Sequence, residues 1–159
     1  MNVTLITVGS LKEKYWKDAC AEYVKRLSAY CRLTVIEVKD EKTPDGCPPA
    51  MEDKIREKEG RRILEKLKDR GMTAVLDIRG SRFDSVAFSA AHERWETQGR
   101  GDLTFIIGGS LGLSGEVLAK ADVRVSFSDM TFPHQLMLVI PLEQLYRSYR
   151  IRNREPYHK

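Results

Sequence analysis

A glycine-rich loop is the first of two segments whose residue types suit the binding of a small ligand. It follows the apolar run Leu103–Ile107 and contains Gly108, Gly109, Gly112 and Gly115. Glycine at this density lets the backbone adopt conformations and make contacts that side chains would block. A strand that leads through such a loop into a short helix often binds a ligand at the carboxyl edge of a sheet. The spacing matches neither a dinucleotide fingerprint nor a P-loop, and glycines that only turn a strand into a helix are the alternative.

A polar loop is the second such segment. Ser128, Asp129, Met130 and Thr131 follow the apolar run Val123–Phe127. The two loops end consecutive strands of the expected sheet, so we predict one ligand site built from both.

The C-terminal end of the chain carries the third set of residues that could do chemistry. From Arg147 to Lys159 the sequence RSYRIRNREPYHK holds five cationic residues and one acid, interleaved with Tyr149 and Tyr157. Such a segment could pair with phosphates and stack on bases. A solvated chain end without a partner is the alternative.

Length and composition indicate one globular domain, residues 1–159, with 42% hydrophobic and 31% charged residues. The longest apolar run, Leu136–Leu142, is far shorter than a membrane span, and the N-terminus lacks the features of a signal peptide. The three cysteines form no CxxC pair, so we expect free thiols in a cytoplasmic protein. The three histidines have no metal-ligand spacing, and we expect no metal. A net charge of +4 is compatible with a polyanionic partner.

Strands and helices alternate along the chain. Hydrophobic periodicity predicts strands at 2–8, 33–38, 73–78, 103–107 and 123–127, and helices at 12–30, 51–70, 85–98, 114–121 and 133–150. This order is typical of an α/β fold, a single parallel sheet with helices on both faces. His92 falls on a helix that we expect at the surface, so we do not assign it a catalytic role.

The last predicted helix is apolar on every side over LMLVIPL, residues 136–142. Because a helix with no polar face must be covered all round, we expect it to form a subunit interface and the protein to be a homodimer. Pro133 is expected in its first turn, and Pro141 should kink it.

Several motifs resemble one family along the whole chain. They are GGSLGL, SFSDMTFPHQL, EQLYR, the terminal PYHK and the opening VTLITVGSLKEKYW. They are similar to the RlmH family of bacterial 23S rRNA pseudouridine-N3 methyltransferases, within the SPOUT superfamily. The resemblance implies a C-terminal trefoil knot, S-adenosyl-L-methionine as cofactor, and a homodimer with composite active sites that acts on the ribosome. Leu138 and Pro141 depart from the family pattern, which has an arginine and an aliphatic residue there.

The resemblance also implies site residues. The cofactor contacts would be Leu76, Gly108 and the loop of Phe127, Ser128, Asp129, Met130, Thr131 and Phe132. The catalytic residues would be His158, Tyr157, Arg147 and Glu143, and Lys159 would help to bind the nucleotide. His158 is the best titratable group, because N3–H is a weak acid and imidazole titrates near neutrality. His134 is its rival, although a structural role at a helix start is an equal alternative.

Two further functions stay open at this point. One is a non-catalytic module that binds RNA or the ribosome through the basic C-terminal segment. The other is a SPOUT methyltransferase that acts on tRNA. Binding of S-adenosylmethionine separates an enzyme from a binding module, and the identity of the methylated RNA separates the two enzymes.

Overall fold

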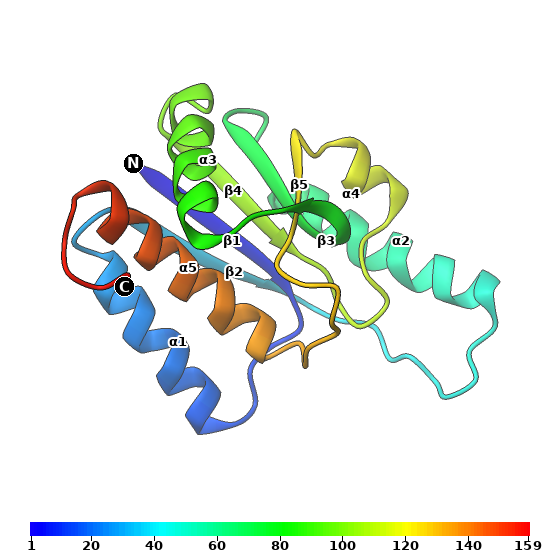
Figure 1. Ribbon diagram of the computed structural model, residues 1–159. Helices are drawn as coiled ribbons and strands as arrows, with labels where there is room; N and C mark the ends of the chain where they lie inside the picture. Colours follow the sequence, from blue (N-terminus) through cyan, green and yellow to red (C-terminus); the bar gives the residue numbers. More distant parts are fainter.

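The computed structural model describes all residues, 1–159. A five-stranded sheet lies between two layers of helices (Figure 1). In chain order the elements are β1 (Asn2–Val8), α1 (Lys14–Leu27), β2 (Arg32–Val38), α2 (Pro49–Lys66), β3 (Met72–Arg82), α3 (Ser85–Gln98), β4 (Asp102–Ile107), α4 (Gly115–Ala119), β5 (Val123–Ser126) and α5 (Leu136–Arg152).

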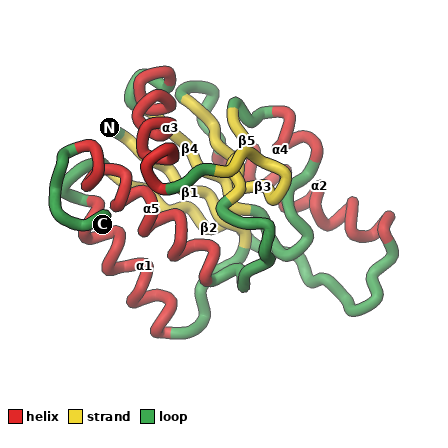
Figure 2. Tube along the Cα trace, in the orientation of Figure 1, coloured by secondary structure: helices red, strands yellow, loops and turns green.

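The strands lie in the order β2-β1-β4-β3-β5, and every neighbouring pair is parallel. β1 and β4 in the middle are the most buried, since they are apolar on both faces as parallel strands under two helical layers must be. The carboxyl ends of all five strands therefore meet at one edge, where the connecting loops lie (Figure 2).

Two apolar cores cover the two faces of the sheet. The larger lies under α1, α3 and α5 and includes Leu5, Phe105, Trp95 and Leu142. The smaller lies under α2 and α4 and includes Ile6, Ile63, Ile106 and Val117. The predicted α/β architecture with helices on both faces is confirmed.

Two element boundaries differ from the prediction in ways that matter for the site. α5 begins at Leu136, so Pro133 precedes its first turn, although the carbonyl of Pro133 still accepts from the Met137 N–H at 3.0 Å. β3 continues to Arg82, four residues beyond its apolar run. Polar residues interrupt that run, and hydrophobic periodicity alone cannot follow a strand through them.

β3 crosses over β5 at a bulge. Leu76 and Ser81 both pair with Val125, so residues 77–80 leave the ladder between them. At Gly80 a Cβ atom would lie 2.6 Å from the backbone C of Arg124 and the backbone N of Val125. Only glycine allows the two backbones to approach this closely.

Gly80→Ala is therefore expected to destabilise the fold by roughly 1–3 kcal/mol, because the new methyl group meets backbone that no rotamer change can move. Urea unfolding followed by circular dichroism measures the change. Gly115→Ala is the matched control, since a Cβ at Gly115 meets no atom within 4 Å. Equal unfolding midpoints for the two variants would contradict a tight crossing at Gly80.

The apolar run at the start of α5 is largely covered by other parts of the same chain. This corrects the premise that only a second subunit could cover it. Leu138 is 2% exposed and Leu142 is 0% exposed, and both belong to the core under α1 and α3. Pro141 is buried as well. Only Leu136, Met137, Val139 and Ile140 keep partly exposed side chains, so any interface on α5 is narrower than the sequence indicates.

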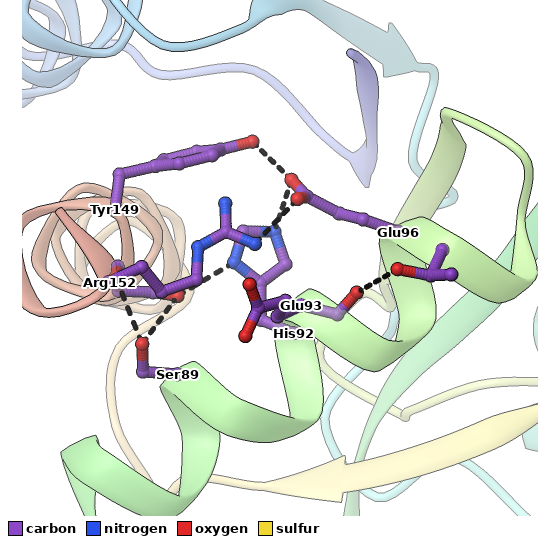
Figure 3. A network of polar contacts seen from close by, with 8 residues as sticks. Ser89, His92, Glu93, Glu96, Tyr149 and Arg152 are labelled. Atoms are coloured by element: carbon purple, nitrogen blue, oxygen red, sulfur yellow. Dashed lines mark hydrogen bonds and ion pairs between the residues drawn. The ribbon is translucent and has the colours of Figure 1, made fainter.

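His92 is fully buried, which corrects its placement on a surface helix. Figure 3 shows it within a polar network between α3 and α5, where its Nδ1 lies 2.8 Å from Ser148 Oγ. Glu96 accepts from Tyr149 and pairs with Arg152 at 2.7 Å. Burial lowers the pKa of His92, so the imidazole is neutral at pH 7. Burial opposes the ionisation of Glu96, but His92, Arg152 and Tyr149 hold its pKa at about 2. This network ties α5 to α3 and is structural.

Candidate active site

The predicted cofactor residues lie at one edge of the sheet. Val75 pairs with Ile106 and Leu76 pairs with Val125, so Leu76 lies level with the last residues of β4 and β5. Gly108 directly follows β4, and Phe127 directly follows β5. The structure therefore brings together the three positions from which the expected site is built.

The glycine loop is a turn folded back on the end of β4. Gly109 and Gly112 form an antiparallel bridge, and the Gly112 N–H donates to the Gly109 carbonyl at 3.1 Å. Gly112 has φ +81°, a left-handed conformation that favours glycine. A Cβ at Gly108 would lie 2.9 Å from the Gly112 carbonyl carbon. The glycines are thus needed for the turn itself, and the turn leaves its backbone open at the sheet edge.

The polar loop presents backbone more than side chains to this edge. The Ser128 side chain accepts from the Met130 N–H at 2.9 Å, and its carbonyl accepts from Ser126 Oγ at 3.1 Å. Asp129 pairs with Arg82 at 2.7 Å on the surface, and Met130 is 73% exposed. The Arg82–Asp129 pair joins the end of β3 to the polar loop, and sequence reasoning did not find it.

A cavity of about 360 Å³ opens beside the polar loop. Phe127 and Phe132 line it together with Phe83, Ile140 and Gln144. Ser85 Oγ donates to the Gln144 side chain at 2.9 Å, which connects α3 to α5 across the cavity. Apolar and aromatic walls with few polar groups are typical of small-molecule sites.

His134 lies at the same edge, between the ends of β1 and β4. Its Nε2 is 3.3 Å from Thr7 Oγ1. Burial lowers the pKa of His134, although the backbone of Val8 and Gly108 favours the protonated form. These contacts connect the segment before α5 to the sheet. They agree with a structural role for His134.

The four predicted catalytic residues form one cluster on α5 and the C-terminal segment. Arg147 pairs with Glu143 at 2.6 Å, and the Tyr157 hydroxyl donates to Glu143 Oε1 at 3.0 Å. The guanidinium of Arg147 lies 4.6 Å from the centroid of the Tyr157 ring and 3.3 Å from His158 Nδ1. Burial, with hydrogen bonds to Tyr23 and Glu143, raises the pKa of Tyr157, so its hydroxyl stays protonated.

The C-terminal segment is ordered against its own chain. The segment folds back alongside α5 of its own chain, and the Tyr157 ring packs edge-on to Tyr146 at 4.9 Å (Figure 1). The cofactor loops lie beyond the other end of α5. Within one chain, the structure does not bring the cluster and the cofactor residues together.

Comparison with known proteins places this geometry in a family. The family model described as "Predicted SPOUT methyltransferase" matches residues 1–158. The chain belongs to the SPOUT methyltransferase family. SPOUT methyltransferases use S-adenosylmethionine, and the trefoil knot expected from the sequence is implied by this membership.

Several relatives match this chain over their full length. "Ribosomal RNA large subunit methyltransferase H" from Clostridium kluyveri is 54% identical over 159 residues, which is 100% of both chains. "Ribosomal RNA large subunit methyltransferase H 1" from Clostridium perfringens is 53% identical with the same coverage. Among solved structures, a "probable methylase family protein" from Haemophilus influenzae superposes with a TM-score of 0.56 at 12% identity, covering 99% of this chain and 70% of that one. This last likeness shows a shared fold.

The residues at the sheet edge fit S-adenosylmethionine. Gly112 has open space where a side chain would lie, and the neighbouring cavity has aromatic walls for a flat base. No three His, Cys, Asp or Glu side chains come together in a way that could hold a metal ion. No helix has the length and apolar character needed to cross a bilayer.

Proposed function

We propose that this protein methylates N3 of a pseudouridine in 23S rRNA, on the large ribosomal subunit or the assembled ribosome. The observation that carries the proposal is the cluster of Glu143, Arg147, Tyr157 and His158, which joins a titratable imidazole to a cation and a phenol. Full-length relatives named as large-subunit rRNA methyltransferases support the choice of substrate. Such an enzyme works in the cytoplasm, where ribosomes are.

The cofactor supplies the methyl group as a sulfonium substituent. Leu76, Gly108 and residues 127–132 hold it at the sheet edge, and the backbone of the two loops supplies most of the contacts. His158 accepts the proton from N3, and Arg147 stabilises the negative charge that develops on the base. The new N–C bond forms as the S–C bond breaks, which leaves S-adenosylhomocysteine. Tyr157 and Lys159 position the nucleotide.

The active protein in this proposal is a homodimer. Arg147, Tyr157 and His158 lie toward the C-terminal end of α5 and the cofactor loops precede its N-terminal end, so a second copy would bring one cluster to the other copy's cofactor site. The partly exposed apolar side chains of α5 offer the surface, with Ile140 at the mouth of the cavity.

Ile140→Lys is expected to yield folded monomers, because the side chain is half-buried and a lysine there would be desolvated only in the dimer. Light scattering at micromolar concentration measures the mass. Leu142→Lys is the contrasting variant, since Leu142 is fully buried and a charge there should unfold the chain itself. A monomeric wild-type protein would contradict the dimer.

Transfer of a labelled methyl group from S-adenosylmethionine tests the substrate in vitro. The acceptors are ribosomes, isolated large subunits and bulk tRNA from a strain that lacks this protein. Label in 23S rRNA supports the proposal. Label in tRNA alone would instead show a tRNA methyltransferase, and cofactor binding without transfer to any RNA would show a binding module.

A further inference from the structure

A buried carboxylate lies behind the glycine loop with one of its oxygens unpartnered. Glu59 on α2 is 4% exposed. Its Oε1 accepts from the Glu41 N–H at 3.0 Å, whereas its Oε2 has no hydrogen-bond partner and no access to solvent. A buried carboxylate that lacks a partner is costly, so its presence calls for an explanation.

The free oxygen points at the glycine turn. A Cβ at Gly109 would lie 3.0 Å from Glu59 Oε2 and 3.4 Å from Oε1. The carboxylate is therefore in direct contact with the loop that precedes α4. No side chain in the loop carries a charge, since its sequence is GGSLGLSG.

The same face of α2 contacts the loop at two further points. Arg56 donates to the Leu111 carbonyl at 3.3 Å. A Cβ at Gly60 would lie 2.3 Å from Ser114 Oγ, so the helix approaches the loop as closely as glycine permits. Positions 56, 59 and 60 have the spacing of one helical face. α2 therefore fixes the shape of the loop, and Glu59 is its charged contact.

The charges around Glu59 do not neutralise it. Arg62 is the nearest cation, but it pairs with Glu41 and donates to the Lys39 carbonyl at 2.8 Å. Asp40 and Glu41 add negative charge nearby. Burial raises the pKa of Glu59, Asp40 and Glu41 raise it further, and Arg62 and the Glu41 N–H oppose the rise. His134, the other titratable group near Asp40, has a pKa lowered by burial and adds no fixed charge.

We propose that Glu59 is a positioning residue, which holds the glycine loop in its cofactor-binding form through the contact between its free oxygen and Gly109. The inference depends on the assignment of this loop to the S-adenosylmethionine site. The ionised carboxylate is the stronger acceptor, and it also favours a cationic cofactor. Cofactor binding should therefore weaken as the pH falls and Glu59 takes up a proton. By linkage, cofactor binding should release a proton in the pH range where Glu59 titrates, which burial places above the usual range of a glutamate pKa.

Glu59→Gln tests this role while keeping the size of the side chain. Calorimetry with S-adenosylmethionine over a series of pH values should give a dissociation constant about tenfold weaker than wild type where Glu59 is ionised, with the difference closing as the pH falls. Glu57→Gln is the control, because Glu57 is exposed on the same helix. Thermal unfolding of each variant shows whether the fold is intact.

A second measurement keeps the proposal falsifiable if Glu59→Gln unfolds. Amide hydrogen exchange at residues 109–112 of the wild-type protein should become faster as the pH falls, beyond the intrinsic change in exchange rate. Unchanged affinity in a folded Glu59→Gln, or loop exchange that follows only the intrinsic rate, would overturn the proposal. A wild-type protein that does not bind S-adenosylmethionine would instead refute the function proposed for the site.

Discussion

Truncation after Pro156 is expected to lower methyl transfer by about 100-fold or more, a typical contribution of a proton-transfer group. The deletion removes Tyr157, His158 and Lys159 and leaves Arg147 paired with Glu143 alone. The cofactor loops are untouched, so the affinity for S-adenosylmethionine should stay near that of wild type. Loss of the Tyr157 contact with Tyr146 should cost only about 1 kcal/mol of stability.

Methyl incorporation into ribosomes from a strain lacking the protein measures this effect, with calorimetry and thermal unfolding in parallel. Arg154→Gln is the matched control, because it removes an exposed cation of the same segment outside the cluster. His158→Ala alone should lower kcat with little change in cofactor affinity. A truncated protein that transfers methyl at the wild-type rate would exclude the C-terminal segment from the chemistry.

Gly108→Val should weaken S-adenosylmethionine binding by at least about tenfold. The added side chain would meet the Gly112 carbonyl and the Leu113 side chain at 2.9–3.0 Å, so the turn must open. The expected effect therefore comes from a clash within the loop itself. Calorimetry on the variant and on Gly115→Ala provides the comparison. Equal affinities would remove the glycine loop from the site.

Hydrophobic periodicity was sufficient to predict the elements of this fold, and its carboxyl-edge loops followed from the α/β pattern. It could not show that β5 lies next to β3, or that β3 crosses β5 at Gly80. Strand order and crossings depend on contacts between segments that are far apart in the sequence, and local periodicity carries no information about such contacts. The knot came only from the family resemblance, since connections that thread through loops are very rare.

The burial of certain polar residues is the main feature that the sequence did not predict. His92 is polar by type, yet it is buried, with its Nδ1 2.8 Å from Ser148 Oγ and its Nε2 3.2 Å from Glu96 Oε1. Glu59 is one of many charged residues on α2, and nothing in their pattern marks it as the buried one. The glycine that follows it was the available signal, because an isolated glycine within a helix often marks a close approach by another segment.

The apolar run of α5 led to an overestimate of the apolar surface that a partner must cover. A helix in the middle of one layer, between α1 and α3, is covered on three sides by its own chain. Leu138 is one of the covered residues, so the departure from an arginine at this position places no apolar side chain in solvent.

The central claim is that this protein methylates a pseudouridine of large-subunit rRNA, and mass spectrometry of rRNA from a deletion strain tests it most directly. We predict that one pseudouridine in 23S rRNA loses a methyl group in the deletion strain. The methyl group should return with the wild-type gene but not with the gene truncated after Pro156. Unchanged 23S rRNA, with a methyl group missing from tRNA or from no RNA, would contradict the account.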